Sequence, residues 1–147
     1  MSRSSIDAID IANVFLKLTD QESGDVLTNL KLQKLAYYSQ GFHLALYNKP
    51  LFDEEFVAWE HGPVVRSLYD KLKNFGSEQV IIDEPIKDSI TEQQKQLISE
   101  INKVYGQFSA WKLRDMTHNE SPWLSTAKGA TITNEKLKTY FKTQLQA

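Results

Sequence analysis

The clearest pattern of apolar and polar positions lies between residues 28 and 47, where apolar side chains recur at helical spacing on two sides. The positions concerned are Leu30, Leu32, Leu35, Ala36, Tyr37, Phe42, Leu44 and Leu46. A helix at the surface of a globular protein needs only one apolar stripe. The pattern therefore predicts one long helix at the centre of the fold, buried on more than one side.

Both ends of this predicted helix carry clear signals. Thr28 is a suitable N-cap, because its hydroxyl can accept a hydrogen bond from the first turn. Leu27 and Leu32 flank it at the spacing of a hydrophobic staple. Asn48 supplies a turn former, and Pro50 cannot continue a helix, so the helix should end near Tyr47.

Weaker patterns predict further helices around this central one. Their expected bounds are a helix capped by Ser5 and ending near Leu18, one opened by Gly62-Pro63 and closed by Gly76, one from Thr91 to Tyr105, one from Ser109 to Met116, a short one with Ser121 as cap, and a last one from Thr133 carrying Leu145. Thr91 and Gln94 have the spacing of a capping box.

Two stretches have the character of extended chain. Residues 56–61 alternate, which favours a short strand, and residues 78–86 are broken by Pro85 and are expected to pair with that strand. The sequence thus predicts a mainly α fold: a single compact helical domain over residues 1–147, built around a buried central helix, with a small extended or β piece.

Composition narrows the functional classes. Hydrophobic residues make up 41% and charged residues 24% of the 147 residues, a globular balance. The net charge of -2 comes from 17 basic and 19 acidic residues without a basic block, which makes nucleic acid an unlikely partner. The chain has no cysteine, which excludes disulfides and thiolate chemistry. No apolar signal core or membrane-length run is present, so we expect a cytoplasmic protein without a membrane partner.

Ser39 and His43 interrupt one apolar face of the central helix at a spacing that lets them touch. One interpretation is a core histidine whose hydrogen bonds tie this helix to a neighbour, and burial statistics favour it. The other is a functional histidine. The sequence alone leaves both open.

Histidines and carboxylates are the candidates for metal or acid–base chemistry. His43, His61 and His118 are the three histidines, and Glu60 and Glu120 lie beside two of them. No two histidines share a ligand spacing on one helix, and the HEXXH pattern is absent. Glycine-rich phosphate loops and a nucleophile elbow are also missing. We therefore predict no metal, no cofactor and no catalytic residue, with a metal-dependent hydrolase as the alternative.

Aromatic residues are concentrated in one part of the chain: Tyr37, Tyr38, Phe42, Tyr47, Phe52, Phe56 and Trp59. Most should belong to the core. Tyr37 and Tyr38 point in different directions from one helix, so at least one of them could sit at a surface, although the core is the favoured place for each. Exposed Tyr and Trp are common anchors of protein interfaces.

Two segments resemble a known family. Residues 31–73, KLQKLAYYSQGFHLALYNKPLFDEEFVAWEHGPVVRSLYDKLK, are similar to the hallmark of the Panacea domain, also called the SocA-like or phage-associated GepA-like family. Residues 113–129, LRDMTHNESPWLSTAKG, resemble its second signature, a threonine-histidine run followed by a proline-tryptophan pair. Two long segments in the right order make this resemblance specific.

The resemblance implies an antitoxin of a toxin–antitoxin pair, often carried on a prophage, that neutralises a toxin by direct protein contact without catalysis. The partner would be a cognate toxin encoded by an adjacent gene. The candidate partner-binding or family-motif residues are Tyr37, Tyr38, Gln40, His43, Trp59, His61, Gly62, Pro63, Thr117, His118, Pro122 and Trp123, and Leu32, Lys34, Leu35, Val64 and Tyr69 also match the family pattern. A DNA-binding autorepressor is a further alternative, which would require salt-dependent binding to its own promoter.

Overall fold

The segment predicted as the central helix forms α2, Asn29–Tyr47, in the computed structural model, which describes residues 5–19 and 26–145. The hydroxyl of Thr28 accepts a hydrogen bond from the backbone N–H of Lys31 at 3.2 Å, as its role as N-cap requires. The helix ends at Asn48, whose φ of 60° places it in the left-handed region. Most of the side chains of α2 are buried.

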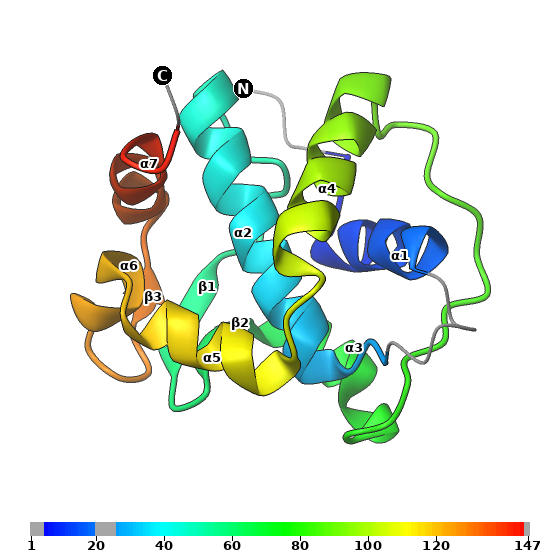
Figure 1. The fold of residues 1–147 in the computed structure, drawn as a ribbon, viewed down its shortest axis with the longest axis horizontal. Coiled ribbons are helices and arrows are strands. Elements are labelled where there is room, and N and C mark those ends of the chain that lie inside the picture. The colour runs from blue at the N-terminus through cyan, green and yellow to red at the C-terminus, as the bar shows by residue number, and fades with distance from the viewer. Residues whose placement is uncertain (1–4, 20–25, 146–147) are drawn as a thin grey trace.

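The other elements surround α2 (Figure 1). The helices are α1 (Ala8–Leu18), α3 (Arg66–Leu72), the 3-10 helix η2 (Lys73–Phe75), α4 (Glu92–Tyr105), α5 (Ala110–His118), α6 (Ser121–Leu124) and α7 (Asn134–Lys142), and the strands are β1 (Phe56–Trp59), β2 (Gly62–Val65) and β3 (Thr131–Ile132). Helix α7 packs along one side of α2, α1 and α4 pack on another, and α5 lies across its N-terminal half. The prediction of a mainly α fold around a buried central helix is confirmed.

The small sheet is antiparallel, with strand order β2-β1-β3. Strands β1 and β2 form a hairpin in which Trp59 lies opposite Gly62. Gly62 has a φ of 108°, which a side chain rarely adopts. On the other edge of β1, Phe56 lies opposite Ile132 of β3.

The prediction that Gly62-Pro63 opens a helix is wrong. Both residues lie in β2, and α3 begins three residues after Pro63, at Arg66. Proline is as compatible with an edge strand as with the first turn of a helix, and β2 is an edge strand of the sheet. Gly76 does end the following helical turn, because its N–H donates to the carbonyl of Lys73.

The predicted pairing of residues 78–86 with β1 is also wrong. The described sheet takes β3 as the second neighbour of β1, and residues 78–86 form no strand. The connector is held instead by single contacts, such as the hydrogen bond from Val80 N–H to the carbonyl of Leu27 at 2.9 Å. A strand of two residues contributed by a distant segment leaves no recognisable pattern in the sequence.

Side-chain caps begin most of the predicted helices where expected. Thr91 and Gln94 form a reciprocal capping box, and Ser109 and Thr133 each accept a backbone hydrogen bond from the third residue of their helix. Four further boundaries differ from the prediction: α1 is capped by Asp7 instead of Ser5, α5 ends at His118 instead of Met116, α6 is capped by Glu120 instead of Ser121, and α7 ends at Lys142, before Leu145.

Helices α2 and α7 approach each other closely at Gly41. A Cβ added at Gly41 would overlap the ring of Phe141, which is fully buried. The missing side chain therefore lets this ring lie directly on the backbone of α2. Within the part of the chain that the structure describes, no helix combines the length and hydropathy needed to cross a bilayer.

Candidate partner-binding site

Glu120 lies at the turn between α5 and α6, where it accepts hydrogen bonds from two neighbouring residues of α2. The Tyr37 hydroxyl donates to one carboxylate oxygen at 2.9 Å, and the Tyr38 hydroxyl donates to the other at 2.8 Å. Burial raises the pKa of Glu120 to about 7, although the two hydroxyl donors act in the opposite direction. This junction fixes the second signature segment to the central helix.

Tyr37 and Tyr38 both belong to the core, as the favoured interpretation predicts, and the alternative of a surface position for one of them is wrong. Both side chains are 0% exposed, and their rings meet edge to face at 5.0 Å. Tyr38 also stacks on Tyr105 of α4, with ring centroids 3.9 Å apart. The two rings point in different directions, but both are covered by protein, because α4 and α7 pack on the two sides of α2 at this point.

Lys34 forms a second buried junction under the β1–β2 hairpin. Its ammonium group donates to the carbonyl of Pro63 at 3.1 Å, and its side chain is fully buried. Burial, aided by the charge of Arg114, lowers the pKa of Lys34 to about 7. A Cβ at Gly62 would lie 2.7 Å from Lys34 Cε and 2.8 Å from Thr117 Oγ1, so only glycine allows this close approach.

Gln40 holds the loop that leads from α2 to β1. Its side-chain oxygen accepts from the N–H of Leu51 at 2.7 Å, and its amide nitrogen donates to the carbonyl of Phe52 at 2.7 Å. Gln40 is fully buried, so these bonds satisfy backbone groups that have no access to water. Its place in the family pattern is explained by this structural contact.

His43 is a satisfied core histidine, as the favoured interpretation predicts. Its Nδ1 lies 2.7 Å from the carbonyl of Lys49, and its Nε2 lies 3.4 Å from the amide nitrogen of Gln94 in α4. Burial lowers the pKa of His43, which favours the neutral ring. Ser39 donates to the carbonyl of Leu35 at 2.8 Å rather than to the histidine.

The second signature segment packs against the hairpin through its tryptophan. Trp123 donates its indole N–H to the carbonyl of Trp59 at 2.8 Å. The ring of His118 stacks on Trp123 with centroids 4.1 Å apart, and burial lowers the pKa of His118. Pro122 is buried beside them. The two segments that resemble the family are therefore in direct contact in the folded chain.

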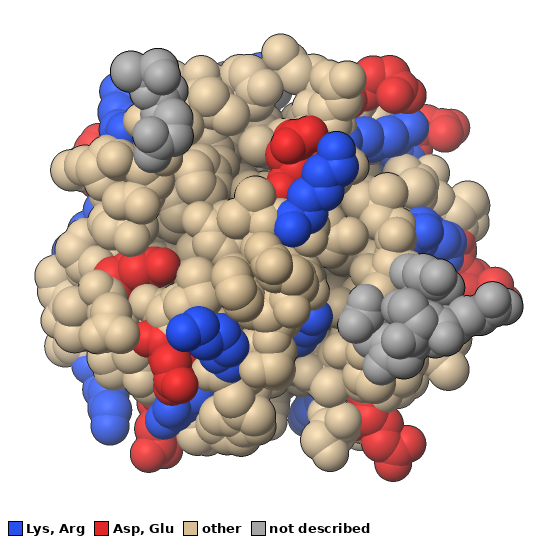
Figure 2. All heavy atoms as spheres, viewed as in Figure 1, with Lys and Arg blue, Asp and Glu red and all other residues tan. Residues whose placement is uncertain are grey.

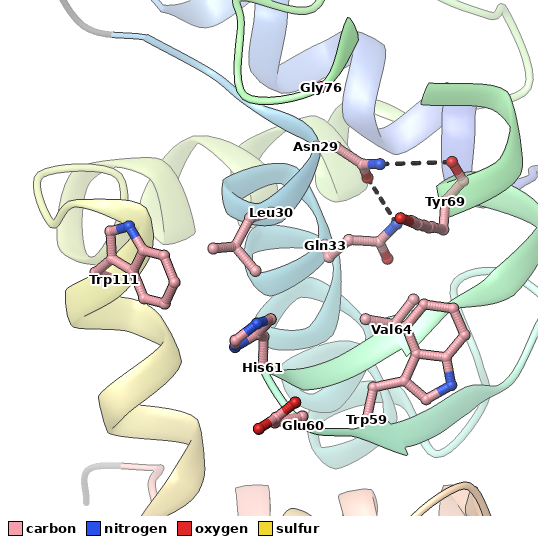
Figure 3. Close-up of a pocket in the computed structure, with 10 residues that line it drawn as sticks. All are labelled: Asn29, Leu30, Gln33, Trp59, Glu60, His61, Val64, Tyr69, Gly76 and Trp111. Carbon is pink, nitrogen blue, oxygen red and sulfur yellow. Dashed lines mark hydrogen bonds between the residues drawn. The ribbon is translucent and has the colours of Figure 1, made fainter. Parts of the chain in front are cut away.

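An open groove adjoins these junctions (Figure 3). It has a volume of about 510 Å³ and lies between the first turn of α2, the turn of the hairpin, α3 and the start of α5. Leu30, His61 and Trp111 line it from α2, the hairpin turn and α5. A second hollow of about 700 Å³ adjoins it and shares the lining residues Leu30, Gly76 and Trp111. We call the two hollows together the α2–α5 groove.

Trp111 is the most prominent side chain of the α2–α5 groove, with 58% of its surface exposed. The guanidinium carbon of Arg114 lies 5.3 Å from the centre of the Trp111 ring, and Arg114 Nε donates to His61 Nδ1 at 3.1 Å. The rings of His61 and Trp111 meet edge to face at 5.4 Å. This arrangement presents an aromatic surface with polar groups at its margin.

Comparison with known proteins finds a family match that includes most of residues 31–73 and 113–129. The family described as "Antitoxin SocA-like, Panacea domain" matches residues 32–124, which run from α2 to α6 and include the hairpin, both buried junctions and Trp111. The chain belongs to this family. One relative is the antitoxin SocA of Caulobacter vibrioides (strain NA1000 / CB15N), which is 36% identical over 88 residues.

That alignment covers 58% of this chain and 45% of the relative, so the chain spans about half the length of the curated Panacea-domain protein that it matches. No solved structure gives a significant match. The family match assigns no role to individual residues, and their contacts in the fold indicate what each one does.

Most of the candidate residues of the Panacea pattern lie inside the fold. Of the twelve candidates, His61 is the only one with an exposed side chain, and the others are buried or half-buried. Their contacts, described above, connect α2, the hairpin and the α5–α6 segment. Their role in binding a partner stays a prediction.

The histidines occupy three different environments. His43 contacts α4, His61 contacts Arg114 and Trp111, and His118 stacks on Trp123. Within the described ranges, no group of three or more His, Asp or Glu side chains is placed to hold a metal ion. Glu120, considered from the sequence as a possible acid–base group, has both carboxylate oxygens occupied by tyrosine donors.

The sequence named several residues that line the groove, among them Trp59 and His61, but did not predict that they form one surface with Leu30 and Trp111. Trp111 has the same periodic signal as the buried residue Leu113 of the same helix. The groove itself has no local signal, because it is assembled from segments far apart in the chain. Lys34 matches the family pattern, yet nothing in the sequence indicates that its ammonium group is buried.

Proposed function

We propose that this protein is an antitoxin that neutralises a toxin by binding it directly, without a catalytic step. The observation that carries the proposal is the Panacea-domain match over residues 32–124. The antitoxin SocA relative supports the same role. We further propose that the toxin is encoded by an adjacent gene, as the family resemblance implies.

The chemistry of the described side chains supports binding rather than catalysis. Lys34 and Glu120, whose pKa values burial shifts to about 7, are both engaged in hydrogen bonds between elements of the fold. Trp111 and Arg114, by contrast, lie at the surface beside a groove, and these residue types recur at the energetic centres of protein interfaces.

Nucleic acid is not the partner that the surface favours. Basic and acidic side chains are interspersed on the face shown in Figure 2, and the net charge is -2. Binding to DNA depends on a cluster of lysine and arginine that neutralises phosphates. A protein surface is therefore the proposed target.

Co-expression tests the proposal. The adjacent gene is induced alone and together with this protein, and growth is measured. We expect growth to stop with the adjacent gene alone and to recover with both. The purified complex should have the mass of both chains together. An adjacent product that is harmless alone, or that remains lethal beside this protein, would contradict the proposal.

A separate measurement tests the absence of catalysis. The toxin released from the complex by mild denaturation and refolding should regain its toxicity and its original mass. A covalent change in the toxin, detected by mass spectrometry, would show that the protein acts as an enzyme. Elemental analysis of the purified protein gives an independent check, because a stoichiometric metal would favour the hydrolase alternative.

A further inference from the structure

The α5–α6 segment, residues 110–124, is held to the rest of the fold by few buried side chains. Its two helices bury Leu113, Thr117 and Pro122, whereas α1 buries seven of its eleven residues. Elements with few buried contacts are the ones that open locally in native proteins. Gly129, which follows the segment, has a φ of 82° and no described group within 4 Å of an added Cβ, so the backbone has room to change its angles there.

Two ionisable side chains lie in the contact between this segment and α2, which α5 crosses (Figure 1). Glu120 of the segment accepts from two hydroxyls of α2, and Lys34 of α2 donates to a backbone carbonyl of the hairpin, close to Thr117 of α5. Within the described ranges, neither group forms a salt bridge with an opposite charge. A buried ionisable group without a counter-charge either becomes neutral or destabilises the contact that buries it.

Glu120 faces four phenols and no cation among its described neighbours. Tyr37 and Tyr38 of α2 donate to it, while burial and the charge of Glu120 raise the pKa of Tyr105 in α4 and of Tyr140 in α7. All four rings are neutral at pH 7. Burial raises the pKa of Glu120 from 4.5 to about 7, so an opening that returns this carboxyl group to water becomes more favourable as pH rises between these values.

Lys34 responds to pH in the opposite direction. Helix α5 turns Arg114 and His118 towards it, and the ionisable residues of the hairpin turn, Glu60 and His61, line the groove instead. Burial lowers the pKa of His118 below 6.5, so its ring is neutral at pH 7. Burial, aided by the charge of Arg114, lowers the pKa of Lys34 from 10.5 to about 7, so opening becomes less favourable as pH rises between 7 and 10.5.

We propose that the α5–α6 segment is a flap that opens transiently from α2, most often near pH 7, because the contact between them buries Glu120 and Lys34 without a counter-charge. Acidification favours the closed flap by neutralising Glu120, and alkaline pH favours it by neutralising Lys34. The open form is a minor population at every pH, so the groove beside α5 persists. The inference concerns the protein alone and does not depend on the proposed function.

Amide hydrogen exchange of the purified protein tests the flap. Between pH 5.5 and 9, each exchange rate is divided by the intrinsic rate at the same pH to give a protection factor. We expect protection of residues 110–124 to be lowest near pH 7 and to rise by up to about tenfold per pH unit on either side. A profile without this minimum would overturn the proposal.

Urea separates local opening from global unfolding. At pH 7, protection in the α5–α6 segment should be at least about tenfold lower than in α1, as expected for a local opening. Urea below the unfolding transition should accelerate exchange in α1 far more than in the segment, because a local opening exposes little surface. Equal protection and equal acceleration in the two regions would show that the segment opens only when the whole protein unfolds, and would overturn the flap.

Three variants assign the two sides of the pH profile. Glu120→Gln keeps the shape of the side chain, and should raise protection of the segment at pH 7 at least about tenfold and abolish the change below pH 7. Lys34→Met should abolish the change above pH 7. Glu135→Gln removes an exposed carboxylate of α7 and should leave both sides intact. A change below pH 7 that survives Glu120→Gln would overturn the proposal, and this test remains valid if Lys34→Met folds poorly.

Discussion

The buried junctions of α2 and the α2–α5 groove lie side by side but differ in almost every physical property. At the junctions, Lys34, Tyr37, Tyr38 and Gln40 are all 0% exposed, and each makes a hydrogen bond to another element of the fold. At the groove, Trp111 is mostly exposed, and its ring contacts Arg114 and His61. The junctions hold elements of the fold together, whereas the groove presents an exposed surface.

The difference explains what a family pattern reports in this protein. Most of the positions that resemble the Panacea family are buried or half-buried, although Trp59, His61, Val64 and Tyr69 also line the groove. An exposed groove residue outside the pattern is not constrained by packing and is free to differ without loss of the fold. We therefore expect the pattern to identify mainly the scaffold, and groove residues outside it, such as Leu30 and Trp111, to influence which toxin is bound.

The strongest test of this contrast compares Tyr38→Ala with Trp111→Ala. Tyr38→Ala leaves a large cavity beside Tyr105 and removes one donor from Glu120, so we expect a loss of about 3–5 kcal/mol in the free energy of unfolding. Trp111→Ala should cost about 0.5 kcal/mol or less. Urea denaturation followed by circular dichroism measures both. Equal losses would show that the two regions are not distinct.

The contact between α2 and α7 gives the next largest effect. Gly41→Ala would place a methyl group in the ring of Phe141, and we expect about 1–3 kcal/mol of destabilisation. In the Phe141→Leu background, Gly41→Ala should cost less than it does in the wild-type protein, because the smaller side chain at position 141 makes room for the methyl group. The thermal midpoints of the two single variants and the double variant measure this difference. Additive losses would contradict a direct contact.

The pH dependence of stability should reveal the two buried charges. Burial raises the pKa of Glu120 from 4.5 to about 7, so between these values the folded state keeps a proton that the unfolded state loses, and stability falls as pH rises. Burial lowers the pKa of Lys34 from 10.5 to about 7, so stability rises as pH increases from about 7 to 10.5. Each slope should reach roughly 1 kcal/mol per pH unit.

Two variants separate these contributions. Glu120→Gln should flatten the acidic side of the profile, and Lys34→Met should flatten the alkaline side, in unfolding experiments between pH 4.5 and 10.5. Neither variant should change toxin binding at Trp111, because neither Glu120 nor Lys34 lines the groove. A slope that survives its matching variant would show that another group is responsible.

The smallest expected effect links the two regions. Ser109 caps the helix that carries Trp111, and Ser109→Ala should cost about 1 kcal/mol of stability. It should weaken toxin binding only slightly, because it loosens the anchor without removing it. Thr133→Ala removes the equivalent cap of α7 and serves as the matched control. If Ser109→Ala and Thr133→Ala affect toxin binding equally, α5 does not belong to the binding site.

Local signals in the sequence predict much of the fold. Thr28, Thr91, Ser109 and Thr133 begin their helices as expected, because a side-chain cap is a contact between near neighbours in the chain. The start proposed at Gly62-Pro63 fails because these residues suit both a helix start and a strand edge, and pairing with distant residues decides between them.

The candidate site was less predictable than the fold. His43 could be interpreted correctly as a core residue because helical periodicity indicates burial. Periodicity did not separate Trp111, at the surface, from Tyr38, in the core, since both occupy apolar positions of helices. The groove exists only where the starts of α2 and α5 meet the hairpin turn, so its composition depends on tertiary structure.

The ring of Phe141 on the backbone of Gly41 has a consequence for choosing where to cut members of this family. The matched stretch ends at residue 124, before β3 and α7, and it begins after α1. A polypeptide trimmed to that stretch would expose the faces of α2 that α1 and α7 now cover. Expression of such a fragment should give an aggregating chain, and recombinant versions should retain the helices at both ends.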